Sequence, residues 1–374
     1  MGNFKISIII PTYNTGNLLK EAMNSIISQT LGFENLEVIF VDDNSNDKIT
    51  KKLIKEYDSK YSNCKSIFLD ENSGFPGKPR NIGINNANSN YLMIMDHDDS
   101  YSATYCEELY DKINETNCDF VFSNFEMVFP NNTTHICDQE FLNQNEIVIN
   151  SITENLDFLT LTPAIWTKIF KKEFINKNNI KFPEGVLAED VYFFIALLIY
   201  GEKIVYLPDN CGYKYKIRNT EEDKSTIHIK NKKYLSAMIK GYFKTLNLLE
   251  KTNNLNFYDI IFRHHLRCWL DNFIDSSLNV KYKNELLNEI SPLFKKELYE
   301  DNEELEIYYL LSTYIRDNKF NQAIILSNKI KKYRQQNGLL NSYIESNNAL
   351  INQLDALNNN SNLSILDKFK NIFK

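Results

Sequence analysis

Short apolar runs alternate with segments of helical periodicity over the first hundred residues, and each apolar run ends in polar residues. The apolar runs, which predict buried strands, are 5–10, 36–41, 65–69 and 91–95. The helical segments between them are 18–27, 47–60 and 80–88. Strands that alternate with helices predict βαβ units and a parallel sheet. We therefore expect an α/β fold whose ligands bind beyond the carboxyl ends of the strands.

The acidic segment 96–99 places three carboxylates within four positions of the end of the fourth strand. Side chains alternate along extended chain, so Asp96 and Asp98 should project to the same side. Convergent carboxylates repel each other unless a cation lies between them, and hard oxygen ligands suit Mg²⁺ or Mn²⁺. The segment predicts a metal–nucleotide site. The alternative is an acidic turn in which Asp99 caps a helix starting near Tyr101.

Composition narrows the class of protein. A chain of 374 residues with 43% hydrophobic content predicts a globular protein of roughly two to three domains. A net charge of −7 gives no sign of a nucleic-acid partner. The sequence has neither a glycine-rich dinucleotide motif after the first strand nor a P-loop. The six cysteines form no zinc spacing, and neither a signal peptide nor a spanning segment is predicted, so we expect a cytoplasmic protein with reduced thiols.

Four polar blocks occur in a fixed order, at 11–14, 42–47, 77–83 and 96–99. Their order and spacing resemble the nucleotide-binding half of an inverting family 2 glycosyltransferase of the GT-A fold. The resemblance implies a Rossmann-like, mostly parallel sheet flanked by helices, with 96–98 as the family's acidic DxD motif. Within the family, the wall teichoic acid glycosyltransferases are the suggestive comparison. The sequence departs from the family at Asn44, where a glycine is usual.

The resemblance implies a nucleotide site made of Pro11, Thr12, Tyr13, Asn14, Asp42, Asp43, Arg80, Asp96 and His97. The first four residues would surround the base. A carboxylate of Asp42 or Asp43 can accept a hydrogen bond from a base imide or a ribose hydroxyl. The alternative is that these acids, or Asn44, cap the helix near Asp47.

For the diphosphate, the resemblance makes Asp98 the metal ligand, with Asp96 nearer the ribose and sugar. His228 is a candidate to complete the metal shell, although a lone histidine is more often structural. Candidates for contacts with the donor sugar or the diphosphate are Lys78, Arg80, Lys214, Arg218 and Ser225. Arg80 is predicted to start a helix, whose N-terminus favours anions; the alternative is a solvated basic turn.

An inverting transfer needs a carboxylate that takes the acceptor proton. The resemblance assigns this role to Asp190, with Glu189 orienting the acceptor or the sugar. The alternative is an acidic pair favoured at a helix N-terminus by the helix dipole. Trp166 is a candidate to stack on an acceptor sugar and equally a candidate core residue.

Helical periodicity dominates after residue 230. The predicted helices are 232–250, 258–278, 284–299, 303–316, 321–335 and 339–357. We expect a catalytic domain at 1–230, an all-α region at 231–357 that binds the acceptor or joins copies of the chain, and a hinge with an amphipathic tail at 358–374. The tail helix 363–374 is basic and amphipathic, which is typical of membrane-surface binding and equally of packing on its own domain. The basic run 263–267 favours a solvated or interdomain face over acceptor binding.

The sequence predicts a metal-dependent glycosyltransferase that uses Mn²⁺ or Mg²⁺. It would transfer a hexose or N-acetylhexosamine from a UDP-sugar to a hydroxyl of a capsule, a teichoic acid or a lipid-linked oligosaccharide. Its place would be the cytoplasm, with the inner face of the cell membrane as the site of any peripheral contact. Two alternatives remain: a noncatalytic glycan-binding scaffold on the same fold, and a nucleotidyltransferase.

Overall fold

A computed structural model describes residues 4–218, 230–294, 298 and 306–338. Ser225, His228, the predicted helix 339–357 and the tail helix 363–374 lie outside the described residues. Contacts divide the chain into two compact units, one ending at Trp269 and the other starting at Leu270. Helices α7 (Lys232–Lys251) and most of α8 (Tyr258–Asp275) therefore belong to the first unit.

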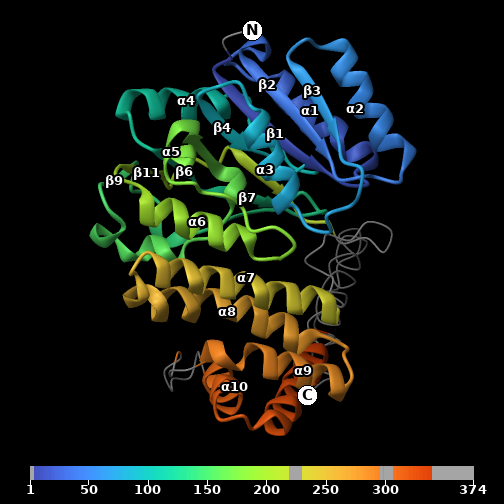
Figure 1. Ribbon diagram of the computed structural model, residues 1–374, viewed down its shortest axis with the longest axis vertical. Helices are drawn as coiled ribbons and strands as arrows, with labels where there is room; N and C mark the ends of the chain where they lie inside the picture. The colour runs from blue at the N-terminus through green and yellow to red at the C-terminus, as the bar shows by residue number, and fades with distance from the viewer. Residues whose placement is uncertain (1–3, 219–229, 295–297, 299–305, 339–374) are drawn as a thin grey trace, which may run out of the picture. The chain divides into compact units, whose positions relative to one another are not determined.

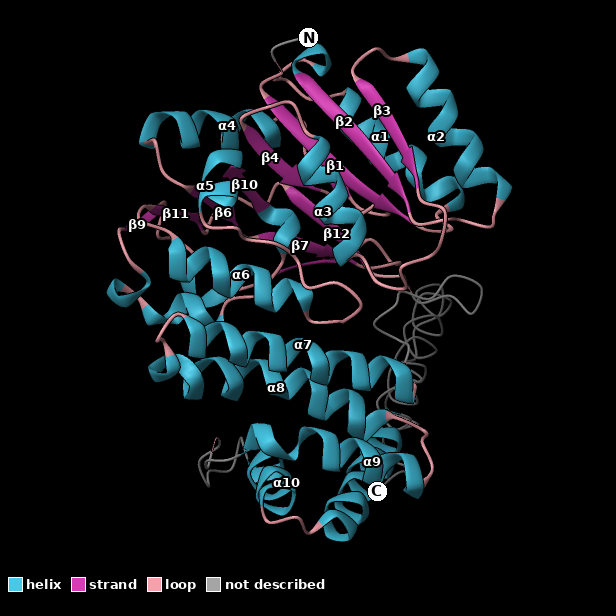
Figure 2. Cartoon of the chain, in the orientation of Figure 1, coloured by secondary structure: helices cyan, strands magenta, loops and turns pink. Residues whose placement is uncertain are grey.

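The first four predicted strands run parallel to one another in one sheet (Figures 1 and 2). They are β1 (Ile6–Thr12), β2 (Leu36–Asp42), β3 (Cys64–Phe68) and β4 (Tyr91–Ile94). Every residue of β1 and β2 is buried, because both faces of a parallel sheet are covered. The intervening helices are α1 (Leu19–Ile27), α2 (Lys48–Lys60) and α3 (Gly77–Asn86). The predicted α/β order of this region is confirmed.

Within the described residues, the sheet has eight strands in the order β3-β2-β1-β4-β10-β6-β11-β9. Strand β10 pairs antiparallel with β4 and with β6, and β11 pairs parallel with β6. A second sheet has the order β5-β12-β7-β8. The remaining strands of the two sheets are β5 (Ser100–Tyr101), β6 (Phe120–Ser123), β7 (Phe125–Val128), β8 (Thr134–Ile136), β9 (Ile147–Ile149), β10 (Lys168–Lys171), β11 (Ile204–Leu207) and β12 (Tyr213–Lys216). The other helices of the first unit are α4 (Tyr105–Thr116), α5 (Lys172–Lys177) and α6 (Glu189–Tyr200).

Helix α3 begins at Gly77, one turn earlier than predicted. Pro79 had suggested a loop up to Arg80. It lies in the first turn of the helix, where a backbone N–H would have no intrahelical partner, so its missing donor costs nothing. The Arg80 N–H donates to the Pro76 carbonyl at 3.0 Å. Arg80 therefore lies inside the first turn of α3, not at the helix start.

The helical region differs from prediction mainly in its boundaries. Helix α8 ends at Asp275, and α9 (Val280–Ile290) begins four residues before the predicted start at 284 and is followed by a 3₁₀ turn at Ser291–Phe294. Asn279 caps α9, because its side chain accepts from the Tyr282 N–H. Helix α10 covers Glu306–Arg316, and residues 320–338 are helical. No helix among the described residues is long and apolar enough to cross a membrane.

Candidate active site

The loops after β1 and β2 are joined by hydrogen bonds. The Asn14 side-chain oxygen accepts from the backbone N–H groups of Asn46 and Asp47 at 2.9 and 3.2 Å. The Asn14 N–H donates to Ser45 Oγ at 2.8 Å. Two of the predicted nucleotide-binding loops therefore form one surface, and Tyr13 on it is 45% exposed.

Asp42 and Asp43 are buried, and neither caps α2. Asp42 accepts from the N–H and the hydroxyl of Ser45 at 2.9 and 2.6 Å, and Asp43 accepts from the Ser73 N–H at 2.9 Å. Asp47 is the residue whose side chain caps α2, so the alternative that Asp42, Asp43 or Asn44 caps this helix is wrong. Asn44 has a φ of 57°, which explains why an asparagine can stand where the family has glycine.

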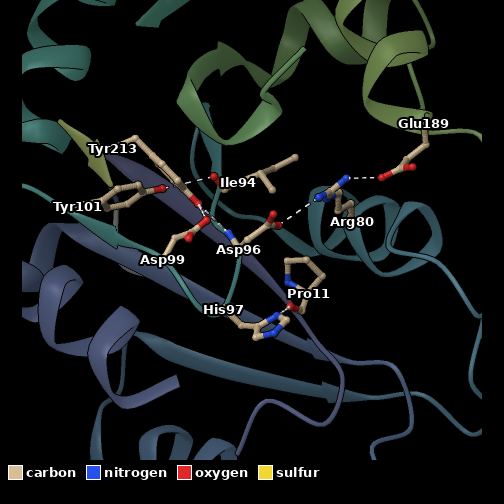
Figure 3. A network of polar contacts seen from close by, with 9 residues as sticks. All are labelled: Pro11, Arg80, Ile94, Asp96, His97, Asp99, Tyr101, Glu189 and Tyr213. Carbon is tan, nitrogen blue, oxygen red and sulfur yellow. Dashed lines mark hydrogen bonds and ion pairs between the residues drawn. The ribbon is translucent and has the colours of Figure 1, made fainter. Parts of the chain in front are cut away.

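The acidic loop after β4 is held by β12 (Figure 3). The Tyr213 hydroxyl donates to Asp99 Oδ2 at 2.7 Å and accepts from the Asp96 N–H at 3.3 Å. The Lys216 N–H donates to Asp99 Oδ1 at 2.9 Å. Burial and the nearby carboxylates of Asp98 and Asp96 raise the pKa of Asp99 well above its ordinary value. The alternative that Asp99 caps a helix starting near Tyr101 is wrong, because α4 begins at Tyr105.

The other two predicted site residues of this loop, His97 and Asp98, contact different parts of the chain. The His97 ring nitrogen Nδ1 lies 3.2 Å from the Pro11 carbonyl oxygen, which joins the acidic loop to the end of β1 (Figure 3). Asp98 is 15% exposed and forms an ion pair with Arg218.

The two predicted lysines of the diphosphate site also have acidic neighbours. Lys214, the second residue of β12, pairs with Glu126. Lys78 is 35% exposed and lies 4.0 Å from Glu71.

Arg80 connects the acidic loop to Glu189, the residue before the predicted base Asp190 (Figure 3). Its Nη2 is 3.1 Å from Asp96 Oδ1 and its Nη1 is 2.7 Å from Glu189 Oε1. The guanidinium is buried, lies over the Phe182 ring at 5.3 Å, and leaves a buried Nε without a hydrogen-bond partner. A buried arginine between two carboxylates is a fixed positive charge at the centre of the site.

Glu189 and Asp190 form the first turn of α6, after Ala188 with a φ of 56°. Burial and the neighbouring Asp190 raise the pKa of Glu189 to about 7, against the opposing effect of Arg80. Burial likewise raises the pKa of Asp190, while the Val191 N–H donates to its Oδ1 at 2.8 Å and opposes the rise. The acidic pair is thus biased toward accepting protons, as a general base working near neutral pH requires.

The pair opens into a cavity of about 650 Å³. One side of the cavity is lined by the loop before α3 and by the turn and first residues of α6, and the other side is a wall formed by α7 and α8. The residues of that wall are Asn231, Lys233, Tyr234, Met238, Tyr242, His264, His265 and Cys268. Of the basic run on α8, His265 is buried with its Nε2 3.1 Å from the Leu159 carbonyl oxygen, and His264 borders the cavity. His265 is therefore not solvated, whereas His264 is exposed; a solvated or interdomain face, and the alternative of acceptor binding, stay predictions for the run as a whole.

Trp166 is 9% exposed and belongs to an aromatic cluster. Its ring stacks with the rings of Tyr213 and Tyr215, at centroid distances of 4.0 and 5.5 Å, and meets Phe125 edge-on. These contacts favour the core role. Stacking of Trp166 on an acceptor sugar stays a prediction.

A metal site formed by protein side chains alone is absent from the described residues, where no group of three or more His, Cys, Asp or Glu side chains is placed to hold an ion. Asp96 and Asp98 nonetheless offer partly exposed, hard carboxylate oxygens. One or two carboxylates combined with phosphate oxygens are the ligand set that Mg²⁺ prefers. The residues present therefore fit a divalent cation that binds together with a diphosphate.

Residues 7–177 match the family model described as Glycosyl transferase family 2. The chain carries a family 2 glycosyltransferase domain. It is 30% identical over 235 residues to the poly(ribitol-phosphate) beta-glucosyltransferase of Bacillus spizizenii, an alignment that covers 63% of this chain and 36% of that protein. It is 28% identical over 346 residues to the poly(ribitol-phosphate) beta-N-acetylglucosaminyltransferase TarP of Staphylococcus aureus, covering 87% of this chain and 99% of TarP.

A solved structure supports the fold of the family 2 domain and its helical extension. Residues 1–349 of S. aureus TarS, in complex with UDP-GlcNAc, match with a TM-score of 0.69 at 23% identity, covering 89% of this chain and 92% of that one. The predicted GT-A fold with a helical C-terminal region is confirmed. This chain spans only 36% of the length of the Bacillus relative.

Three features of the site were not predicted. The hydroxyl of Tyr213 joins Asp99 to the backbone of Asp96, Arg80 joins two carboxylates that are far apart in the sequence, and α7 forms part of the cavity wall. A sequence signal existed only for Tyr213, which alternates with Tyr215 in the strand before Arg218. The other two features depend on packing between distant segments.

Proposed function

We propose that this chain is an inverting glycosyltransferase that transfers a sugar from a UDP-sugar to a hydroxyl of a poly(ribitol-phosphate)-type teichoic acid. The observation that carries the proposal is the Arg80 bridge from Asp96 of the acidic loop to Glu189, beside Asp190 and the cavity. This bridge supports the proposal because the acidic loop and the acidic pair that contains the candidate base share one buried cation. The names of the Bacillus and Staphylococcus relatives support the acceptor class.

The donor would bind where the loops after β1, β2 and β4 meet. The exposed Tyr13 ring offers a face for the base, and the buried Asp42 and Asp43 hold the loops that surround it. The cationic groups of Arg80 and Arg218 lie beside Asp96 and Asp98, where they can contact phosphate oxygens. The TarS structure with UDP-GlcNAc makes UDP-sugars the first donors to test.

Enzymes of this fold commonly use divalent metals. Asp98, with Asp96 beside it, would hold the ion, whose charge offsets the negative charge that develops on the leaving diphosphate. Mn²⁺ and Mg²⁺ both suit these oxygen ligands.

In the transfer step, Asp190 takes the proton of the acceptor hydroxyl. The acceptor oxygen forms a bond to the anomeric carbon as the bond from that carbon to the diphosphate oxygen breaks, and the electron pair leaves with the diphosphate. Attack from the face opposite the leaving group inverts the anomeric configuration. Glu189, fixed by Arg80 at 2.7 Å, orients the reacting groups. The acceptor lies in the cavity between Asp190 and the wall of α7 and α8.

The rest of the chain has proposed roles that follow the expected domains. Residues 1–230 would perform catalysis, and residues 231–357 would bind the acceptor polymer or join copies of the chain, which the cavity wall from α7 and α8 supports for the acceptor. The tail 363–374, outside the described range, would contact the inner face of the cell membrane, with the preceding residues from 358 as the hinge.

Thermal unfolding with a panel of nucleotide-sugars tests the proposal. UDP-glucose, UDP-GlcNAc, GDP-mannose and free UDP are each added with and without Mn²⁺. A ligand at about 100 times its dissociation constant stabilises the folded state by about 2.7 kcal/mol, so a UDP-sugar is expected to raise Tm only when Mn²⁺ is present. The Asp98→Asn variant should lose the Mn²⁺-dependent part of this shift.

A turnover assay completes the test. The donor that raises Tm is incubated with ribitol-phosphate oligomers, and release of UDP and the anomeric configuration of the product are measured. Glycosylated oligomer with inverted configuration is expected. Binding of donor without any transfer to these oligomers contradicts the acceptor class, and the absence of a Tm shift with every nucleotide favours the noncatalytic glycan-binding alternative.

A further inference from the structure

The backbone turn that precedes the candidate base has an unfavourable conformation. Ala188 has a φ of 56°, a left-handed geometry that residues with a Cβ rarely adopt outside asparagine and aspartate. Such a conformation persists only where the surrounding structure determines it. Because Glu189 and Asp190 follow directly, whatever holds this turn also fixes the position of the Asp190 carboxylate.

Helix α7 packs against the turn without any side chain between the two backbones. A Cβ added at Gly241 would lie 1.8 Å from the Leu187 carbonyl oxygen and 3.3 Å from the Ala188 Cβ. The Leu187 N–H donates to the Ala237 carbonyl of the same helix at 3.2 Å. Any residue other than glycine at position 241 would have to push either the helix or the turn away.

Helix α3 fixes the start of the segment 182–188, whose last two residues are the Leu187–Ala188 turn. The Asn81 side chain donates to the Phe182 carbonyl and accepts from the Phe182 N–H, both at 2.9 Å. A Cβ at Gly77 would lie 2.5 Å from the Pro183 carbonyl oxygen. Because its first residues are held in this way, the segment 182–188 responds to a displacement near α7 by moving the Leu187–Ala188 turn. Asp190, two residues after this turn, moves with it.

We propose that Gly241 is a positioning residue for the general base. Helix α7, which begins 55 residues after the end of the matched family 2 region at residue 177, acts as the template that holds the Leu187–Ala188 turn and so aims Asp190 at the acceptor hydroxyl. The inference rests on the proposed role of Asp190 as base. It assigns a catalytic consequence to a helix that otherwise contributes only to the cavity wall.

The test compares Gly241→Ala with the wild-type chain. A misplacement of about 1 Å remote from the reacting atoms can cost on the order of 100-fold in rate, so kcat is expected to fall by about 100-fold. The dissociation constant for UDP-sugar and its KM should stay unchanged, because Gly241 contacts the Leu187–Ala188 turn and not the loops after β1, β2 and β4. The acid limb of the kcat–pH profile should also shift, since the surroundings of Asp190 change.

Gly201→Ala is the matched control at the other end of α6. Its new Cβ would meet Ile204 Cγ1 at 2.8 Å and the Leu197 carbonyl oxygen at 2.9 Å, so it introduces buried strain without contacting the Leu187–Ala188 turn. We expect a lower Tm and an unchanged kcat. If both variants lose the same fraction of kcat, general destabilisation explains the loss and the proposal is overturned.

A second variant keeps the test informative if Gly241→Ala does not fold. The double variant Gly241→Ala/Ala188→Gly removes the Ala188 Cβ and lets the turn move away from α7, since glycine accepts a wide range of backbone angles. It should fold and still show the low kcat. Wild-type kcat in the folded single or double variant overturns the proposal.

Asp190→Asn, measured in parallel, separates this inference from the proposed function. If Asp190→Asn loses turnover and Gly241→Ala keeps it, only the positioning role of Gly241 is wrong. If Asp190→Asn keeps turnover, the base assignment fails, and the inference about Gly241 fails with it.

Discussion

The two acidic regions of the site are built in opposite ways. At the strand ends, Asp42, Asp43 and Asp99 accept hydrogen bonds from neighbouring loops and from β12. At the start of α6, Glu189 and Asp190 are packed beside each other with one arginine for the pair. Carboxylates that accept several hydrogen bonds are fixed in place, whereas two buried carboxylates sharing one cation compete for protons.

This difference matches the two proposed roles, which are nucleotide binding at the strand ends and proton transfer at the start of α6. The strand-end acids hold the shape of the loops where a nucleotide would bind. The helix-start acids have raised pKa values and border the cavity, which suits a group that exchanges a proton near neutral pH. The pKa of Asp99 is raised as well, but Asp99 is held by Tyr213 and Lys216 and does not line this cavity. Arg80 touches both regions, so it sets how strongly each depends on the other.

The largest expected effect comes from Asp190→Asn. An amide cannot take the acceptor proton, and general-base catalysis contributes about 10²- to 10⁴-fold to rate, so kcat should fall within that range. Nucleotide binding should persist, because Asp190 borders the cavity and not the loops after β1, β2 and β4. Steady-state kinetics with calorimetric titration of UDP checks both.

Asp98→Asn is the matched substitution in the strand-end region, and it should weaken donor binding instead. Weaker UDP binding in Asp190→Asn with unchanged UDP binding in Asp98→Asn would contradict the division between the two regions.

The next largest effect is expected from Arg80→Met, which breaks the connection between the strand-end and helix-start regions. Removing one partner of a buried ion pair costs about 3–5 kcal/mol, because Asp96 and Glu189 lose their shared cation. We expect a loss of this size in the free energy of unfolding by urea, together with loss of turnover. Lys78→Met, in the same helix and 35% exposed, should change stability by less than about 0.5 kcal/mol. Equal stability of the two variants would mean that Arg80 does not join the regions.

The sequence predicted the local parts of this comparison. The four parallel strands, the acidic loop after β4 and the acidic pair at the start of α6 all depend on short segments whose pattern is visible in the chain. The resemblance to family 2 glycosyltransferases gave Arg80 and Asp190 their candidate roles. The family 2 model matches residues 7–177, which include Arg80 but not Asp190, and both roles stay predictions.

What the sequence did not predict depends on contacts between distant segments. Pro79 concealed the true start of α3 at Gly77. For Asp99 the local sequence offered only the alternative of capping a helix, but β12, more than a hundred residues later, supplies its hydrogen bonds. Likewise no local pattern marks Gly241, because its importance comes from the backbone of Leu187 that lies against it.

The smallest effect is the contribution of Glu189, in the helix-start region, to the pH dependence of stability. The folded-state pKa of Glu189 is about 7 against an ordinary value of 4.5, so between these values the folded chain binds more protons than the unfolded chain. Its contribution to the free energy of unfolding is therefore full below about pH 4.5 and is lost as the pH rises through about 7, at roughly 1.4 kcal/mol for each unit of pKa shift. Glu189→Gln removes the titration, so the wild type should lose stability relative to this variant over that window in urea unfolding at several pH values. The exposed Glu173→Gln should run parallel to the wild type. Parallel curves for all three chains would mean that Glu189 stays ionised throughout, and that the helix-start acids are fixed as firmly as those at the strand ends.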